Sequence, residues 1–333
     1  MPAWTPALAL VEPGALEYPL GRRLAARLRA DGVPLEPLPP GGGRGTLLPF
    51  SRAKRTLVVA VRRTLRFRPC PPSADYQLPL ATGCPALCQY CYLHGIPHDP
   101  GWVRVYVNLE EILSEAARVI ALRAPSPTSF EAAAAADPVA VEPLTGALSQ
   151  AVEFFGAEPW GRLRFATKFP PPGGLLCARH RGRTRARVSL NAKTPLQRFE
   201  PGAPGLAARF EALAAFRDAE YPVGVLIAPV MVFPGWEEEY RRLLRDLAHR
   251  LHGARDLTFE VITFRFTGLS RRIIEARFPS SGLDLGQEGR AVRRGPGGRA
   301  KYVYSPERME GVRRLFERLV SGLFPGGRLE YVI

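Results

Sequence analysis

The sequence predicts an α/β fold with mostly parallel strands. Between residues 102 and 264, short segments of strand character alternate with longer segments that carry apolar residues at helical spacing. Such alternation is typical of parallel strands joined by helical crossovers. Apolar residues make up 46% of the 333 positions, which is enough to fill one large core. The order of segments alone fits a doubly wound sheet or a closed or partial barrel.

Periodicity gives the expected elements. Strands are expected over residues 56–67, 102–107, 163–167, 187–190, 223–232 and 257–264, and helices over 20–28, 109–122, 143–155, 206–219 and 236–251. Residues 37–45 are rich in proline and glycine and predict a boundary loop. We therefore expect a small N-terminal α/β extension over residues 1–45 and the main domain over residues 46–333.

Charge and cysteine usage indicate the compartment and the partner. The net charge of +15 predicts a salt-dependent attraction to phosphate backbones, so nucleic acid is the expected partner. No apolar run is long enough for a membrane span, and residues 1–20 lack the pattern of a signal peptide. Five cysteines, three of them packed together, fit metal ligation in a reducing compartment better than disulfides. We expect a cytoplasmic protein.

Three cysteines stand on one short segment, in the pattern Cys84-x3-Cys88-x2-Cys91. Three thiolates can ligate three irons of a [4Fe–4S] cluster and leave the fourth iron open. The open iron can take the amino and carboxylate groups of S-adenosylmethionine. A structural zinc site is the alternative, but it normally needs four protein ligands, and only His94 or His98 lies nearby as a fourth.

The position of this segment favours a barrel over a doubly wound sheet. It directly follows the apolar run of residues 77–81, and in barrels the chemistry lies on loops beyond the carboxyl ends of the strands. Tyr90 and Tyr92 flank the last cysteine. They either pack around the loop or act as a hydrogen or electron relay.

Residues around the cysteines extend the pattern. The chain resembles the spore photoproduct lyase family in Leu80-Ala81-Thr82-Gly83-Cys84, Cys91-Tyr92-Leu93, Val103-Arg104-Val105-Tyr106-Val107-Asn108, Thr167-Lys168, Ser189-Leu190-Asn191, Phe199-Glu200-Pro201-Gly202, Ala228-Pro229 and Lys301-Tyr302-Val303-Tyr304. The resemblance runs from about residue 56 to the end. It implies a partial (β/α)6 TIM-like barrel of the radical SAM type, a [4Fe–4S] cluster and S-adenosylmethionine. It also implies a DNA substrate and a reducing electron donor of the flavodoxin or ferredoxin type.

The same resemblance implies which residues contact the cofactor. Lys168, Ser189, Asn191 and Ala228 match family positions that touch S-adenosylmethionine. The alternative for Ser189 and Asn191 is that they only end a strand and cap a turn. We expect all four to bind the cofactor.

The chain departs from the family where the lyases carry a cysteine that donates hydrogen to the substrate radical. The corresponding position here is Ala134, which has no hydrogen weak enough to give. Tyr90, Tyr92 and Cys177 remain as candidate donors. Arginines persist near residue 293, but Phe233 and Phe264 stand where histidine is expected from the resemblance.

We therefore expect a radical SAM lyase that acts on a DNA pyrimidine lesion with a hydrogen donor other than the usual cysteine. Two alternatives stay open. The substrate could be RNA or another nucleotide, since a basic surface attracts both nucleic acids equally. The protein could also keep the cluster while binding nucleic acid without catalysis, given the loss of the cysteine at Ala134.

Overall fold

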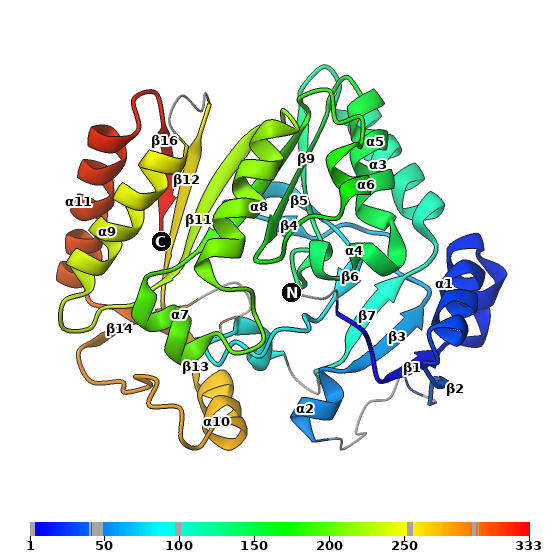
Figure 1. Cartoon of the computed structure of the whole chain (residues 1–333), viewed down its shortest axis with the longest axis horizontal. Coiled ribbons are helices and arrows are strands. Elements are labelled where there is room, and N and C mark those ends of the chain that lie inside the picture. The colour runs from blue at the N-terminus through cyan, green and yellow to red at the C-terminus, as the bar shows by residue number, and fades with distance from the viewer. Residues whose placement is uncertain are drawn as a thin grey trace. The chain divides into compact units, whose positions relative to one another are not determined.

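The computed structural model describes residues 4–39, 41, 49–96, 101–251, 256–294, 298 and 300–333 (Figure 1). These residues fall into two compact units. Unit 1 comprises Met1–Pro85, His98–Ala186 and Asp218–Pro222, and unit 2 comprises Ala86–Pro97, Arg187–Arg217 and Val223–Ile333. No helix among the described residues is long and apolar enough to cross a membrane.

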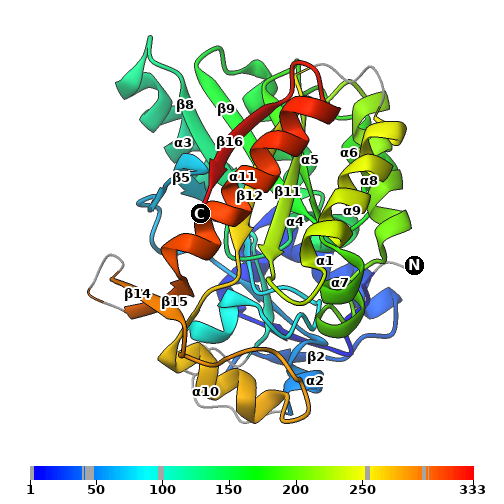
Figure 2. The same ribbon diagram turned by 90° about the vertical axis from the view of Figure 1, so that its left-hand side faces the viewer.

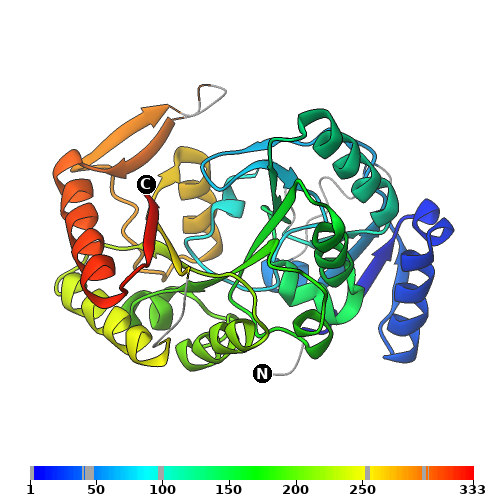
Figure 3. The same ribbon diagram turned by 90° about the horizontal axis from the view of Figure 1, so that it is seen from above.

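Unit 1 contains a five-stranded sheet in the order β2-β1-β3-β7-β6. Its strands are β1 (Leu8–Val11), β2 (Leu35–Pro37), β3 (Thr56–Ala60), β6 (Ala81–Thr82) and β7 (Val103–Tyr106), and all pairs are parallel except β6 with β7. The accompanying helices are η1 (Pro13–Glu17), α1 (Pro19–Ala30), α2 (Phe50–Ala53) and α3 (Leu109–Arg123). Figure 3 shows α1 beside β1 and β2.

The N-terminal strand is hydrogen-bonded to a strand of the main domain. β1 pairs with β3 in register, Leu8 opposite Thr56. The segment expected to be a separate extension therefore shares a sheet with residues beyond it. The boundary at residue 45 lies outside the described residues, and the division into two domains there stays a prediction.

A second set of strands in unit 1 leads to the cysteine segment. It consists of β4 (Pro69–Cys70), β5 (Ala74–Leu78), β8 (Thr128–Ala132) and β9 (Gly161–Thr167), with the helices α4 (Pro138–Thr145), α5 (Ala147–Ala157) and α6 (Gly173–Leu176). β5, β8 and β9 run parallel, while β4 pairs antiparallel with β5. The carboxyl ends of these parallel strands therefore lie at one edge of the sheet.

Unit 2 contains parallel strands covered by long amphipathic helices. Its parallel strands are β11 (Val223–Val230), β12 (Thr258–Thr263) and β16 (Arg328–Val332). Its helices are η3 (Tyr92–Gly95), α7 (Lys193–Phe199), α8 (Leu206–Asp218), α9 (Trp236–Arg250), α10 (Gly268–Arg277) and α11 (Pro306–Leu323). Figure 2 shows α9 and α11 side by side next to β12 and β16. Tyr240 of α9 and Phe316 of α11 are fully buried, with ring centroids 5.6 Å apart.

A small antiparallel sheet completes unit 2. It has the order β13-β15-β14, with β13 (Phe266–Thr267), β14 (Arg290–Arg294) and β15 (Ala300–Tyr304). The larger sheet has the strand order β16-β12-β11-β10-β9-β8-β5-β4, in which β10 (Thr184–Leu190) belongs in part to each unit. The α/β prediction with mostly parallel strands is confirmed.

Two expected elements differ from the structure. Strand character over residues 56–67 continues only to Ala60, because the next backbone N–H groups are bound by side chains: Val61 N donates to Glu12, and Arg62 N donates to Asn108. The helix expected over residues 143–155 is two helices, α4 and α5. Gly146 separates them with a φ of +62°, a left-handed conformation that ends a helix.

Candidate active site

Cys84 begins the cysteine segment in unit 1, and backbone contacts fix the chain just before it. Gly83 has a φ of +77°, and a Cβ there would lie 2.0 Å from the carbonyl oxygen of Trp102. Its N–H donates to the carbonyl of Ala135 at 2.8 Å, and the Lys54 ammonium donates to the carbonyl of Cys84 at 2.8 Å. Only glycine fits this close approach.

Cys88 and Cys91 lie in unit 2, where the segment is tied to residues 199–201. Leu87 N donates to the carbonyl of Pro201, and Gln89 N donates to the carbonyl of Phe199, both at 2.9 Å. Cys88 is buried, Cys84 and Cys91 are half-buried, and none of the three forms a disulfide with another described cysteine. These backbone hydrogen bonds fix this part of the loop, and the three cysteines supply its sulfur atoms.

The donor set fits an iron–sulfur cluster. Within the described residues, no three His, Cys, Asp or Glu side chains are grouped as ligands of a single ion. A cubane cluster puts each thiolate on a different iron, which suits three thiols spaced along one loop. These residues could therefore hold a [4Fe–4S] cluster, and their assignment as ligands stays a prediction.

Histidine partners for the zinc alternative are otherwise engaged or not described. His94 is buried, with Nε2 3.1 Å from the carbonyl oxygen of Cys88 and Nδ1 2.8 Å from a guanidinium nitrogen of Arg277. Its ring nitrogens thus face the protein. His98 lies outside the described residues.

The two tyrosines of the segment have different environments. The Tyr90 hydroxyl donates to the Glu200 carboxylate, and burial together with the nearby negative charges raises the Tyr90 pKa well above its usual value. This hydroxyl therefore stays protonated at neutral pH. Tyr92 is 64% exposed at the start of η3. The relay role of both tyrosines stays a prediction.

Lys168 follows β9 in unit 1, and a buried aspartate holds its backbone. The Asp137 carboxylate accepts hydrogen bonds from Lys168 N at 2.8 Å and from the Thr167 hydroxyl at 2.7 Å. It also accepts one from Ala140 N as the N-cap of α4. Burial raises the pKa of Asp137, although these hydrogen bonds oppose the shift. Asp137 therefore fixes the chain where β9 ends.

Ser189 and Asn191 lie at the end of β10 in unit 2. Asn191 is fully buried; its Oδ1 accepts from the Tyr240 hydroxyl at 2.8 Å, and its Nδ2 donates to Glu200 at 3.2 Å. Ser189 is also buried, and its hydroxyl makes no hydrogen bond to any described residue. An amide nitrogen carries two N–H groups, so one of those on Asn191 remains to donate, as does the serine hydroxyl.

Ala228 lies where β11 departs from its neighbour. β11 pairs with β12 at Ile227 and again at Val230, and the register shifts between them. The intervening residues Ala228 and Pro229 include a proline, which has no N–H for a ladder. Their backbone is thereby turned out of the regular pairing at the carboxyl end of the strand. The predicted contact of Ala228 with the cofactor is untested.

Ala134 lies in unit 1 close to the start of the cysteine segment. Gly83 forms a parallel bridge with Ala136, and Ala133 N donates to the carbonyl of Leu78 at 2.8 Å. The turn that contains Ala134 is therefore attached to the residue before Cys84. The alternative donor Cys177 is exposed at the end of α6.

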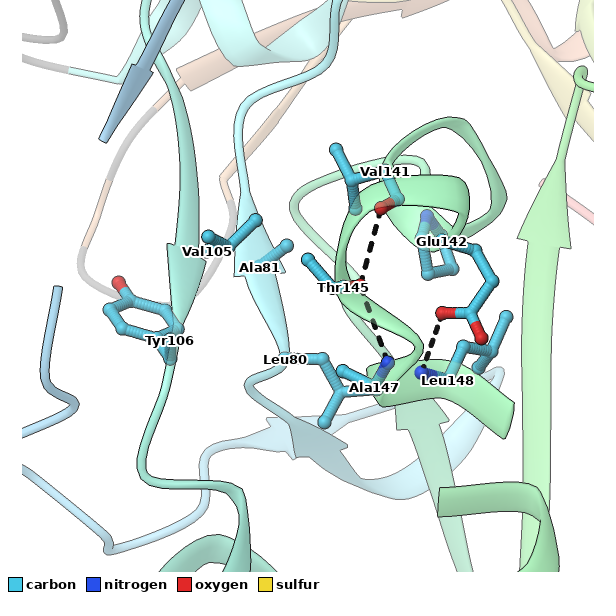
Figure 4. A pocket seen from close by; sticks show the side chains of 10 residues that line it. Leu80, Ala81, Val105, Tyr106, Val141, Glu142, Thr145, Ala147 and Leu148 are labelled. Carbon is cyan, nitrogen blue, oxygen red and sulfur yellow. Dashed lines mark hydrogen bonds between the residues drawn. The ribbon is translucent and has the colours of Figure 1, made fainter. Parts of the chain in front are cut away.

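A small cavity in unit 1 does not provide a substrate site. Leu80, Val105 and Leu148 line it together with Glu142, whose carboxylate accepts from Leu148 N (Figure 4). Its volume is about 10 Å³, the space of one water molecule. It is too small for a nucleotide-sized ligand.

The small sheet of unit 2 carries an arginine over an aromatic cluster. The Arg290 guanidinium lies 4.7 Å from the ring centroid of Tyr304, 5.0 Å from that of Phe266 and 5.4 Å from that of Phe264. Phe264 is thus a core residue, and Phe233 packs against the same cluster. Arg293 and Arg294 are exposed on β14. Residues 295–297 and 299 lie outside the described residues.

Sequence reasoning missed the roles of Glu200, Arg209, Tyr240 and Asp137. The segment Phe199-Glu200-Pro201-Gly202 carried part of the resemblance, but no role was assigned to its carboxylate. The available signal was a glutamate next to Pro-Gly with an arginine in the following helix. That pattern does not show which distant side chain the glutamate meets.

Comparisons with known proteins agree with this geometry. The family model described as spore photoproduct lyase matches residues 4–333. This chain belongs to the spore photoproduct lyase family. It is 39% identical to the spore photoproduct lyase of Bacillus subtilis (strain 168), covering 98% of each chain. It is 40% identical to that of Geobacillus sp. (strain Y412MC61), covering 99% of each.

Solved structures match over the whole chain. A spore photoproduct lyase complexed with dinucleoside spore photoproduct has a TM-score of 0.96 and 40% identity, covering 100% of both chains. A doubly substituted lyase with bound AdoMet and dinucleoside spore photoproduct has a TM-score of 0.95 at the same identity and coverage. The partial-barrel fold expected from the resemblance is confirmed.

Proposed function

We propose that this protein is a radical SAM enzyme that repairs spore photoproduct in DNA. The observation that carries the proposal is the full-length match to solved relatives that hold AdoMet and dinucleoside spore photoproduct. The chain supports it with three cysteines on one loop and with polar groups at the ends of β9 and β10. The substrate is accordingly a thymine dimer joined through a methylene bridge.

Cys84, Cys88 and Cys91 would hold the [4Fe–4S] cluster as thiolates. When bound, the cluster supplies the electron that cleaves AdoMet to a 5′-deoxyadenosyl radical, which takes hydrogen from the lesion. Each end of the loop is held within its own unit: Gly83 lies against Trp102 in unit 1, and residues 87 and 89 are hydrogen-bonded to residues 199–201 in unit 2. These contacts fix the backbone beside the cysteines.

The cofactor would be bound by groups from several strand ends. Lys168 would provide a cation, and Ser189 and Asn191 would provide the hydroxyl and the amide N–H that no described residue occupies. Ala228 would provide a surface at the end of β11, where a small side chain allows close approach. Asp137 and Tyr240 orient two of these residues through the hydrogen bonds described above.

The hydrogen that ends the reaction has to come from a residue other than Ala134. We assign this role to Tyr90 and Tyr92, whose phenolic O–H groups carry a transferable hydrogen. The tyrosyl radical that this transfer leaves would return to the phenol by taking one electron from the reducing partner and one proton from solvent. Tyr90 keeps its proton because its pKa is raised by burial. Cys177 is exposed at the end of α6.

The partners follow from the substrate and the charge. A net charge of +15 attracts the DNA backbone, and exposed Arg293 and Arg294 provide cations on β14. An electron donor of the flavodoxin or ferredoxin type would reduce the cluster. A DNA substrate also supports the expected cytoplasmic location.

The test is an anaerobic turnover assay with dinucleoside spore photoproduct. Reduced protein with its cluster should convert the lesion to two thymidines and form 5′-deoxyadenosine, and Cys88→Ala should do neither. Cofactor cleavage with an unchanged lesion would refute the lyase assignment. Greater stimulation of cleavage by RNA or free nucleotides would favour another substrate, and absence of cleavage under strong reduction would favour a non-catalytic protein.

A further inference from the structure

A fully buried ion pair lies behind the cysteine segment in unit 2. The carboxylate of Glu200 and the guanidinium of Arg209 are both 0% exposed and are hydrogen-bonded to each other. Glu200 is the residue that follows α7, and Arg209 lies in the first turns of α8. Burying two charges is costly unless their remaining hydrogen-bonding capacity is satisfied. The partners that satisfy it therefore indicate what the pair holds together.

Glu200 accepts hydrogen bonds from two parts of the predicted site. One oxygen accepts from the Tyr90 hydroxyl and, at 3.2 Å, from Nδ2 of Asn191, while the other oxygen faces Arg209. Tyr90 lies between Cys88 and Cys91, and Asn191 is a predicted contact of AdoMet. A single carboxylate thus links the cysteine loop to the end of β10.

Arg209 fixes the other side of this link. Its Nε donates to the carbonyl of Pro204 at 2.8 Å, and a terminal nitrogen donates to the carbonyl of Ser189 at 3.2 Å. The guanidinium therefore connects the end of β10, which carries Ser189, to the loop after Glu200. A planar guanidinium does this with fixed geometry, which a lysine would not reproduce.

Backbone contacts on both sides of Glu200 reinforce the link. Residues 199 and 201 accept the N–H groups of residues 89 and 87, so the loop is paired with this segment as a short ladder. Gly202 has a φ of +74°, and a Cβ there would lie 3.4 Å from the nitrogen of Leu87. The loop and the glutamate segment therefore lie in close contact along several residues.

We propose that Glu200, held by Arg209, is a positioning residue that orients the cysteine loop and the Asn191 amide together. It thereby sets both how tightly the cluster is retained and how tightly AdoMet is bound. This inference rests on the proposed function, because it assumes that the loop holds a cluster and that Asn191 contacts the cofactor. Glu200 is a ligand of neither the cluster nor AdoMet, and it acts only through Tyr90 and Asn191.

Two substitutions separate the two ends of the link. Tyr90→Phe removes only the hydroxyl that binds the loop to Glu200. This variant should lose its cluster to a chelator about tenfold faster than the wild type, because a hydrogen bond to a charged group worth about 1.4 kcal/mol corresponds to a factor of about ten. Its AdoMet affinity should change by less than about threefold, since the Asn191 contact remains. Glu200→Gln should impair both properties by about tenfold or more, because it disturbs both partners and leaves Arg209 without its anion.

Both readouts are independent of substrate turnover. Cluster loss is followed by visible absorbance in excess chelator, and AdoMet binding by the change in the electron paramagnetic resonance spectrum of the reduced cluster. No DNA is present, so a role of Tyr90 as hydrogen donor would alter neither measurement.

Unit 2 offers a matched control. The Tyr331 hydroxyl donates to the buried Glu260, which is paired with Arg187 at 2.7 Å, so the same three residue types meet at another place. Tyr331→Phe removes a hydrogen bond of the same kind, and both readouts should stay within about twofold of the wild type. If Glu200→Gln does not fold, Tyr90→Phe against Tyr331→Phe still decides the question.

The inference is overturned if Tyr90→Phe retains its cluster as long as Tyr331→Phe does, or if folded Glu200→Gln binds AdoMet like the wild type. Failure of the proposed function looks different. In that case the wild-type protein itself would hold no cluster, fail to cleave AdoMet, or leave spore photoproduct unchanged.

Discussion

At the scale of the residue, Ala134 distinguishes this protein from the chemistry implied by its family. Its turn is attached to Gly83, directly before the first cysteine, so the position is structurally retained while the thiol is absent. A methyl group contributes no hydrogen that a carbon radical can take at useful rates. Under the proposed function, the final hydrogen transfer therefore needs a different group.

Ala134→Cys should restore a thiol at the family position. We expect faster lesion repair and fewer by-products per AdoMet cleaved, because a thiol gives hydrogen to a carbon radical more readily than a phenol does. Product analysis after anaerobic turnover measures both quantities, with Ala135→Cys in the same turn as the control. Equal repair by the two cysteine variants would contradict a position-specific donor.

Asp137 gives the protein a pH-dependent stability with a defined sign. Burial raises its pKa in the folded state above the value of about 3.9 expected when unfolded. Between these two pKa values the folded protein binds more protons than the unfolded protein. The contribution of protonated Asp137 to the unfolding free energy is therefore complete below about pH 3.9 and is lost as the pH rises through the folded pKa. The unfolding free energy of the wild type minus that of Asp137→Asn should therefore increase as the pH falls from 7.

Urea unfolding of both proteins over a series of pH values measures this difference. Effects of other titrating groups cancel in the subtraction. A difference that does not change with pH would show that the pKa of Asp137 is the same in both states.

At the scale of the element, the entry to the cysteine loop depends on backbone geometry at Gly83. Gly83→Ala would place a methyl group against the Trp102 carbonyl and force alanine into a left-handed conformation. We expect the unfolding free energy to fall by about 2 kcal/mol or more, and reconstitution of the cluster to be poor.

Gly235→Ala separates the two causes. Gly235 has a similar φ of +81°, but nothing lies within 4 Å of a Cβ there. Its substitution should lower the unfolding free energy by only about 1 kcal/mol, the cost of placing alanine in a left-handed conformation, and should leave the cluster in place. Equal effects of the two alanines on cluster content would argue against the close approach at Trp102.

At the scale of the whole molecule, the charge of +15 predicts DNA binding that weakens steeply with salt. Replacing Arg293 and Arg294 together by alanine should reduce the slope of the logarithm of the DNA association constant against the logarithm of the salt concentration by about two. Arg314→Ala is the control, since Arg314 is ion-paired to Glu310 at 2.7 Å. Fluorescence anisotropy with labelled duplex DNA measures the slopes; an unchanged slope in the double variant would show that β14 does not contact phosphate.

Much of the fold could be predicted from local pattern. Helices α3 and α9 and strand β9 follow from apolar periodicity, because each buries one face. Strand β11 follows from its continuous apolar run, which is buried on both faces. Short or polar elements such as β8 and β14 could not be predicted, because strand pairing rather than their own residues makes them regular. The helix break at Gly146 depends on a backbone conformation that glycine permits but does not dictate.

The sequence by itself determined the three thiols and the excess of positive charge, because these are facts of composition and spacing. The sequence also shows an alanine at position 134, and the resemblance to the family implies that a donor cysteine is missing there. Tertiary structure alone revealed that Glu200 accepts the hydroxyl of Tyr90, 110 positions away, and also the amide of Asn191. Local periodicity encodes which face of an element is buried, but not which distant side chain meets a buried charge. That meeting depends on the path of the whole chain and on the need to satisfy every buried polar group.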